Sequence, residues 1–353
     1  MDQHKTSHGE KYKLIADTIR LYPNQFKQAW DDLKYLQLPD NYKNSENIVF
    51  CGMGGSALGA RMVNSFSSNR LRIPLEIING YDIPNYVNKN TLVVVSSYSG
   101  TTEEVIDCTY KSIKTGAKVF GITTGNTLAD ILQKEKYPFY LIDPTYNPSG
   151  QPRMSIGYSF GATLALFNKL SFLSVSEEEV EDTLSASFNA LTQYHENSPS
   201  EKNASLIFAQ SLKGKIPILV ASEHLSGTAY TIKNQFNENA KTFSVLFEIP
   251  ELNHHLMEGL SNPVKQKDIL KFIFFKSNLY DSRLQKRYSV TEKVLEKNLI
   301  DHISYTPMSG KKLPQVFESL IFGSFVVYNL TKLYDIEPIA IPWVDYFKKQ
   351  LSK

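Results

Sequence analysis

Hydroxyl side chains crowd the turn that follows one apolar run of the sequence. Val93, Val94 and Val95 lead into residues 96–102, after which a helical pattern begins. The hydroxyl-bearing residues at its centre are Ser97, Ser99, Thr101 and Thr102. Gly100 frees the backbone, and the N-terminus of the following helix offers unpaired N–H groups and the positive end of a dipole. Because the turn lacks Lys and Arg, it suits a compact phosphate monoester, although a hydroxyl-rich helix cap without a ligand has the same composition.

A second turn of this kind lies upstream. Residues 47–51 predict a buried strand, and a glycine-rich segment that includes Gly55 and Ser56 then opens a helix. The spacing of Gly52, Gly54 and Ala57 also fits the G-x-G-x-x-A pattern of dinucleotide-binding proteins, which keeps a dehydrogenase as a rival interpretation. That pattern expects an acidic residue at the end of the next strand, whereas Glu76 lies in mid-strand. Two such turns together favour a phosphate ligand.

Other residue types suit proton transfer but are not decisive alone. Glu238 ends a predicted helix, Arg153 follows a turn-rich stretch, and Lys348 lies close to the C-terminus. Each is also an ordinary solvated surface residue by composition. The adjacent pair His254 and His255 point apart on a helix or strand, and no H-x-x-x-H or Cys partner accompanies them. We therefore predict no metal site.

The two turns resemble those of the sugar isomerase (SIS) domain, a phosphosugar-binding module. Two later segments make the chain similar to the bifunctional phosphoglucose/phosphomannose isomerase family of archaea and bacteria. They are Asn237-Glu238-Asn239-Ala240-Lys241 and Pro250-Glu251-Leu252-Asn253-His254. The likeness extends from residue 22 to residue 348, and the order and spacing of these segments are more specific than any one motif.

The resemblance implies an aldose–ketose isomerase that interconverts glucose 6-phosphate, and also mannose 6-phosphate, with fructose 6-phosphate without a cofactor. Glu238 would move the proton between C2 and C1 through a cis-enediol intermediate. His254 would open the sugar ring by passing a proton between O1 and O5, with Lys348 assisting at the ring oxygen. Arg153 would face the reacting carbons and stabilise an enediolate.

The phosphate would contact both turns. The implied contacts are Gly55, Ser56, Ser97, Ser99, Thr101 and Thr102. The chain departs from the family pattern at Thr101 and at His255, where Asn is usual in both places. The family forms homodimers in which the histidine aligned with His254 comes from the neighbouring subunit, so a shared active site is implied. The preference between the two C2 epimers does not follow from these residues.

A non-catalytic phosphosugar sensor is the alternative, because the same module serves in regulators. Such regulators usually carry a DNA-binding helix-turn-helix with a basic face, and this sequence shows none. The aminotransfer synthases that share the module carry a glutaminase domain with an N-terminal nucleophilic Cys, which this sequence also does not show.

The pattern of the whole chain predicts a repeated α/β scaffold that would position the candidate residues. Expected strands cover 47–51, 73–78, 91–97, 117–122 and 137–142, with helical stretches between most of them, which predicts a parallel sheet covered on both faces. A second set follows at 215–221, 243–247 and 272–275. We predict a helical arm (1–45), two doubly wound SIS-type domains (46–194 and 204–335) and a C-terminal segment (336–353) that carries Lys348. The second domain's first turn lacks glycine and serine density, which predicts one phosphate site per chain.

Composition restricts the partners. The 353 residues carry a net charge of +2 with no long basic run, so nucleic-acid binding is not indicated. Two cysteines and no visible signal peptide favour a reducing cytoplasm. The longest apolar segment, 156–173, is interrupted by Gly, Ser, Asn and Lys, so we expect a buried helix and no membrane partner.

Overall fold

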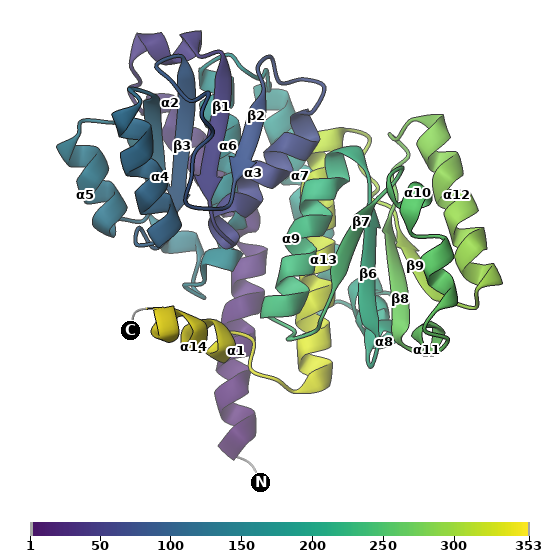
Figure 1. Cartoon of the computed structure of the whole chain (residues 1–353). Coiled ribbons are helices and arrows are strands. Elements are labelled where there is room, and N and C mark those ends of the chain that lie inside the picture. The colour runs from purple at the N-terminus through teal and green to yellow at the C-terminus, as the bar shows by residue number, and fades with distance from the viewer. Residues whose placement is uncertain (1–2, 352–353) are drawn as a thin grey trace.

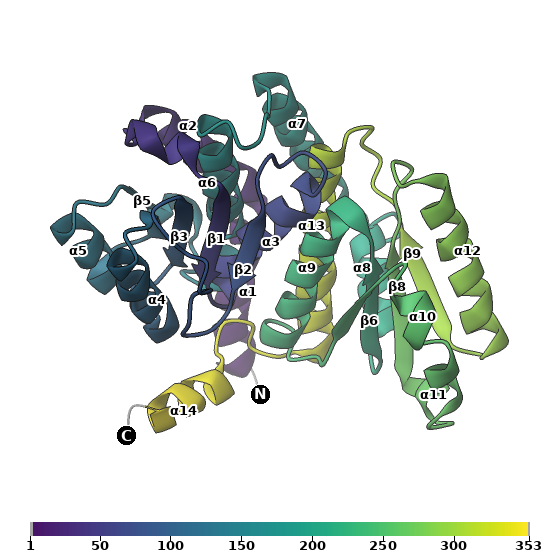
Figure 2. The same ribbon diagram turned by 45° about the horizontal axis from the view of Figure 1, so that its top comes forward.

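The chain forms two α/β units, one on each side of a pair of long helices. The computed structural model describes residues 3–351. Figure 1 shows α9 (Ser226–Glu238) and α13 (Lys312–Tyr334) running between the two sheets, and the rotated view of Figure 2 agrees. The fold expected from the sequence, two parallel-sheet α/β domains, is confirmed.

The first sheet has the strand order β2-β1-β3-β4-β5, and all its pairings are parallel. Its strands are β1 (Asn47–Gly52), β2 (Leu75–Ile78), β3 (Thr91–Ser97), β4 (Lys118–Thr123) and β5 (Phe139–Leu141). Both faces of β1 and β3 are buried, because alternate side chains point to helices on opposite sides. Val93 and Val95 pack with α4 (Glu103–Lys114), while Leu92 and Val94 belong to the core on the other face.

Further helices belong to the first part of the chain, up to Tyr194. They are α1 (Gln3–Arg20), α2 (Tyr22–Tyr35), α3 (Gly55–Ser67), α5 (Asn126–Lys134), α6 (Ile156–Lys169) and α7 (Glu177–Tyr194). Pro23 stands in the first turn of α2, where its missing N–H costs nothing, and so separates α1 from α2. Ser176 caps α7 by accepting a hydrogen bond from the Glu179 amide at 3.1 Å.

The second sheet has the order β7-β6-β8-β9 and is also parallel. Its strands are β6 (Ile216–Ala221), β7 (Val245–Glu248), β8 (Leu270–Phe275) and β9 (Asp301–Tyr305). The remaining helices are α8 (Ala204–Leu212), α10 (Leu252–His255), α11 (Gln266–Ile269), α12 (Ser282–Lys297) and α14 (Pro342–Leu351). In both views α10 and α12 lie beyond the second sheet, whereas α14 lies below the first sheet.

Two elements were not foreseen as such. β9 reads Asp-His-Ile-Ser-Tyr, a short polar pattern that suits a sheet edge and gives no strong strand signal. The charged segment 286–297, whose composition suits either a helix or a hairpin, forms all of α12 beyond its first turn. α9 ends at Glu238, the residue expected at the end of a helix.

Helix α13 is the one helix, among the described residues, that is long and apolar enough to cross a membrane. However, 89% of its most apolar window is buried inside the protein. It packs against α7, α8 and α9, so its apolar residues have a partner on every side. Burial of this kind is what a central core helix requires.

Candidate active site

The two predicted phosphate turns lie side by side. β1 and β3 are neighbours in register, with Gly52 opposite Ser96, so the segments that follow both strands leave the same edge of the sheet. The chain passes from β1 outward to β2 and then back across β1 to β3, which makes this edge the topological switch point. Ligands of open α/β sheets bind at such points.

Within the hydroxyl turn the candidate side chains divide into two groups. Ser97 is fully buried and holds the turn together: its Oγ accepts from the Gly100 amide at 3.1 Å and lies 2.8 Å from Thr102 Oγ1. Ser99 and Thr101 are exposed and hydrogen-bonded to each other at 3.1 Å. Gly100 has φ +70°, and a Cβ there would lie 1.9 Å from the Gly125 carbonyl oxygen, so only glycine fits. Ser99, Thr101 and the half-buried Thr102 are the hydroxyls in position to meet a ligand.

The glycine-rich turn connects to this one and to Arg153. Ser56 is buried, and its Oγ accepts a hydrogen bond from the Tyr98 amide at 2.9 Å. A Cβ on Gly55 would lie 2.7 Å from the backbone nitrogen of Arg153, so glycine permits the close approach of the Arg153 segment. Asn147 Nδ2 completes the link by donating to the Tyr98 hydroxyl at 2.9 Å and to the Gln151 carbonyl at 3.0 Å.

Arg153 and Glu238 form the charged centre of this region. Their side chains approach to 3.9 Å between Nη1 and Oε2, although η3 (Pro152–Met154) and the end of α9 are far apart in sequence. Arg153 is 2% exposed, and its Nε donates to Asn239 Oδ1 at 2.5 Å. Its Nη1 donates to Gln151 at 2.9 Å. The guanidinium is therefore fixed by both halves of the chain.

A C-terminal strap, residues 337–341, covers the guanidinium. Arg153 Nη2 donates to the carbonyls of Pro338 at 3.0 Å and Ile339 at 2.7 Å. Because the strap carbonyls bind Nη2, Nη1 is the guanidinium nitrogen that faces the Glu238 carboxylate. The strap leads into α14, where Lys348 is exposed and close enough to act electrostatically on Glu238.

The electrostatics of Glu238 suit a base. Burial raises the pKa of its carboxyl above the usual value, while the charges of Arg153, Lys241, Lys233 and Lys348 oppose that shift. About a third of the side chain, 31%, remains exposed. A carboxylate whose pKa is raised toward the working pH, with one face open to solvent, fits a proton-transfer role.

His254 lies elsewhere. It is exposed on α10, which both figures place beyond the second sheet, away from α14 and the first sheet. No side-chain hydrogen bond or ion pair of His254 is present among residues 3–351, and it does not meet Arg153 or Glu238 within the same chain. The neighbouring His255 packs its ring 5.9 Å from that of Phe247. Of the predicted catalytic residues, the structure thus gathers Arg153, Glu238 and Lys348 but not His254.

Comparisons with known proteins identify the family of the chain. Residues 201–351 match the family model described as bacterial phospho-glucose isomerase C-terminal SIS domain. A bifunctional phosphoglucose/phosphomannose isomerase of Caldicellulosiruptor bescii is 28% identical over 96% of this chain and 99% of its own length. The enzyme of that name from Thermoplasma acidophilum is 30% identical over 87% of this chain and 90% of its own. The chain belongs to the bifunctional phosphoglucose/phosphomannose isomerase family.

The fold extends beyond this isomerase family. The crystal structure of tagatose-6-phosphate ketose/aldose isomerase from Escherichia coli superimposes with a TM-score of 0.70 at 16% identity, covering 94% of this chain and 96% of that one.

The dinucleotide interpretation finds no support at β2, because Glu76 lies within the strand and accepts a hydrogen bond from the Tyr86 hydroxyl at 2.5 Å. In the part of the chain that is described, no group of three or more His, Cys, Asp or Glu could hold a metal ion.

The second domain repeats the topology of the first. At the carboxyl ends of its strands, however, the segment that follows β6 packs against tyrosine side chains. The Ser222 amide donates to the Tyr280 hydroxyl at 3.3 Å, and Ser222 Oγ contacts the Tyr288 hydroxyl at 3.1 Å. The two tyrosine rings stack with centroids 5.5 Å apart, and both are buried. Buried tyrosines therefore pack against the segment that follows β6, whereas exposed hydroxyls follow β3 in the first domain.

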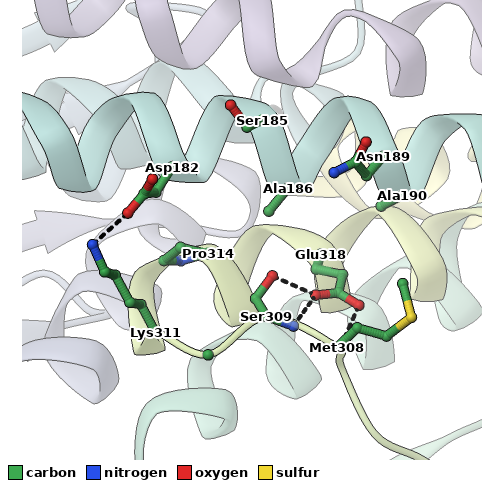
Figure 3. Close-up of a pocket in the computed structure, with 11 residues that line it drawn as sticks. Asp182, Ser185, Ala186, Asn189, Ala190, Met308, Ser309, Lys311, Pro314 and Glu318 are labelled. Atoms are coloured by element: carbon green, nitrogen blue, oxygen red, sulfur yellow. Dashed lines mark hydrogen bonds and ion pairs between the residues drawn. The ribbon is translucent and has the colours of Figure 1, made fainter.

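Figure 3 shows a separate hollow of about 510 Å³ between α7 and the start of α13. Its charged groups are paired within the protein: Lys311 contacts Asp182 at 2.5 Å, and Glu318 accepts from the Ser309 amide at 3.0 Å. It shares no lining residue with the Arg153 and Glu238 centre. We assign it no role in the chemistry.

Several residues of the site were not singled out from the sequence. Asn239 holds Arg153, Lys241 lies beside Glu238, and Glu337 organises the strap. Asn239 and Lys241 stand inside the segment 237–241 that carried the resemblance, so a signal was present for them. Residues 337–341 carried no such signal, since main-chain acceptors have no sequence signature.

Proposed function

We propose that the chain is an aldose–ketose isomerase that interconverts glucose 6-phosphate and mannose 6-phosphate with fructose 6-phosphate. The names of the relatives support this substrate class. The observation that carries the proposal is the Arg153 and Glu238 pair, which lies next to two hydroxyl-bearing turns at a switch point. Phosphate held at the turns would leave the sugar carbons within reach of the carboxylate.

Each residue has a role in this proposal. Glu238 takes the proton from C2 of the open-chain aldose and returns it to C1, which passes through a cis-enediol. Arg153 orients the carboxylate and favours negative charge on the enediolate oxygens. Ser99, Thr101 and Thr102 bind the phosphate, and Lys348 assists at the ring oxygen.

We propose further that the working unit is a cytoplasmic homodimer in which His254 of one subunit completes the site of the other. Two observations support this. His254 is exposed on α10, and no histidine of the same chain contacts Glu238 in the part that the structure describes. Leu256 and Met257, half-buried beside it, offer apolar surface for a partner. Shared sites of this kind require an isologous contact between two copies.

Deuterium exchange tests the reaction directly. Purified protein incubated with fructose 6-phosphate in D₂O should yield glucose and mannose 6-phosphates that carry deuterium at C2, followed by NMR. The ratio of the two products would also give the epimer preference. A phosphosugar sensor would bind the same ligand without placing deuterium in it, and that result would overturn the proposal.

The phosphate turn gives a binding prediction. Ser99→Ala combined with Thr102→Val should raise KM at least ~10-fold, because a hydrogen bond to a charged group contributes ~1.5–3 kcal/mol. Inhibition by inorganic phosphate should weaken in parallel, while kcat changes less. Ser97→Ala is the comparison variant: its hydroxyl is buried within the turn, so it should lower thermal stability as well. An unchanged KM in the double variant would place the phosphate elsewhere.

The pH profile should report the raised pKa of Glu238. Only the carboxylate accepts a proton, so kcat/KM should fall as the pH falls through that pKa, which lies above the usual carboxyl value because of burial. Lys233→Met removes a positive charge that lowers the pKa of Glu238. It should therefore move the acid limb to higher pH. A limb that stays in place in this variant would assign the titration to another group.

A further inference from the structure

Lys241 adopts a backbone conformation that disfavours a side chain. It lies just beyond α9 with φ +48°, in the left-handed region that glycine occupies most readily. A glycine would make the turn with less strain. Strained backbone persists where surrounding contacts fix it, and Lys241 makes such contacts through its side chain.

The ammonium group of Lys241 joins two elements of the candidate site. Its Nζ donates to the Glu238 carbonyl at 2.7 Å and to the Pro338 carbonyl at 3.3 Å. Pro338 also accepts from Arg153 Nη2 at 3.0 Å. Two cations from different parts of the chain therefore share one acceptor on the strap.

The strap itself is held in shape by Glu337. This carboxylate accepts from the Ile339 amide at 2.6 Å and from the Ala340 amide at 2.7 Å, and it lies 3.7 Å from Lys11 of α1. α14 begins at Pro342, directly after the strap, and none of its described residues is buried. The strap therefore connects α14 and Lys348 to the Arg153 and Glu238 centre.

We propose that Lys241 is a positioning residue that clamps the C-terminal strap onto the end of α9 and so holds Lys348 beside Glu238. The proposal rests on the isomerase function proposed above. It adds a residue that touches neither phosphate nor the reacting carbons but fixes the distance between the base and the lysine of α14.

The charges around Lys241 make the clamp sensitive to pH. Burial lowers the pKa of its ammonium to about 8, the positive charge of Arg153 acts in the same direction, and Glu337 and Glu238 oppose it. Above that pH the neutral amine donates more weakly to the two carbonyls. The activity should consequently decline on the alkaline side as the clamp loosens.

Lys241→Gly is the sharpest test because it relieves the backbone while removing the amine. Lys136→Gly is the matched control: Lys136 also has a positive φ, +61°, but is exposed at the end of α5. We expect Lys241→Gly to lower kcat ~10-fold, the size expected for losing a hydrogen bond from a charged donor, with little change in KM or melting temperature. Lys136→Gly should keep the kcat of the wild type.

Hydrogen–deuterium exchange of the substrate-free protein separates this proposal from the function on which it rests. In Lys241→Gly the amides of residues 337–351 should exchange faster than in the wild type, whether or not the chain proves to be an isomerase. Wild-type kcat, or unchanged exchange in this segment, would overturn the clamp.

If the glycine variant fails to fold, Lys241→Arg decides: its guanidinium stays charged, so kcat should be largely restored and the alkaline decline near pH 8 should disappear. A decline that persists unchanged would refute the proposal.

Discussion

Replacing Glu238 by glutamine is expected to lower kcat by ~10²–10⁴-fold, the usual contribution of a general base. The amide has nearly the same shape as the carboxylate, so it can keep its place 3.9 Å from Arg153 Nη1 but cannot accept the C2 proton. The measurement is the steady-state conversion of fructose 6-phosphate, together with deuterium incorporation as an independent readout of proton transfer.

Glu248→Gln is the matched control for this substitution. Glu248 is an exposed carboxylate at the end of β7 and takes no part in the Arg153 centre, so this variant should retain wild-type kcat. Inhibition of Glu238→Gln by inorganic phosphate should remain normal, since the turns are untouched. A Glu238→Gln enzyme with kcat within a few-fold of the wild type would show that another group is the base.

The second large effect is expected from mixing two inactive proteins. Homodimers of Glu238→Gln and of His254→Ala should each be nearly inactive, whereas a mixed dimer would contain one intact site and one site with both lesions. Its activity should approach half that of the wild type. The physical reason is the separation of α10 from the Arg153 and Glu238 centre within one chain.

Subunit exchange must be verified by mass spectrometry for this result to count. Mixing Glu238→Gln with Arg153→Lys serves as the control, because both residues belong to the same centre and no mixed site would be intact. If mixed dimers of Glu238→Gln and His254→Ala form without recovering activity, His254 does not act across the interface. Partial rescue of His254→Ala by open-chain substrate would separately support its ring-opening role.

Features that depend on local patterns could be predicted from the sequence. A short apolar run rich in β-branched residues, such as 92–95, favours a buried strand of a parallel sheet, and the hydroxyls and Gly100 that follow it favour a turn where that strand ends. Because parallel neighbours end at the same edge, the closeness of the two turns also followed from the order of elements. The family resemblance then identified Arg153, Glu238 and Lys348 as residues that belong together.

How those groups are held depends on contacts that form only when distant segments pack together. The acceptors of Arg153 are main-chain carbonyls of Pro338 and Ile339, which any residue could supply and which come close only after both domains have packed around α13. The contact of Lys241 with the Pro338 carbonyl likewise joins residues that are far apart in sequence. The pKa of Glu238 and the exposure of His254 are properties of burial, and burial depends on contacts between segments far apart in sequence.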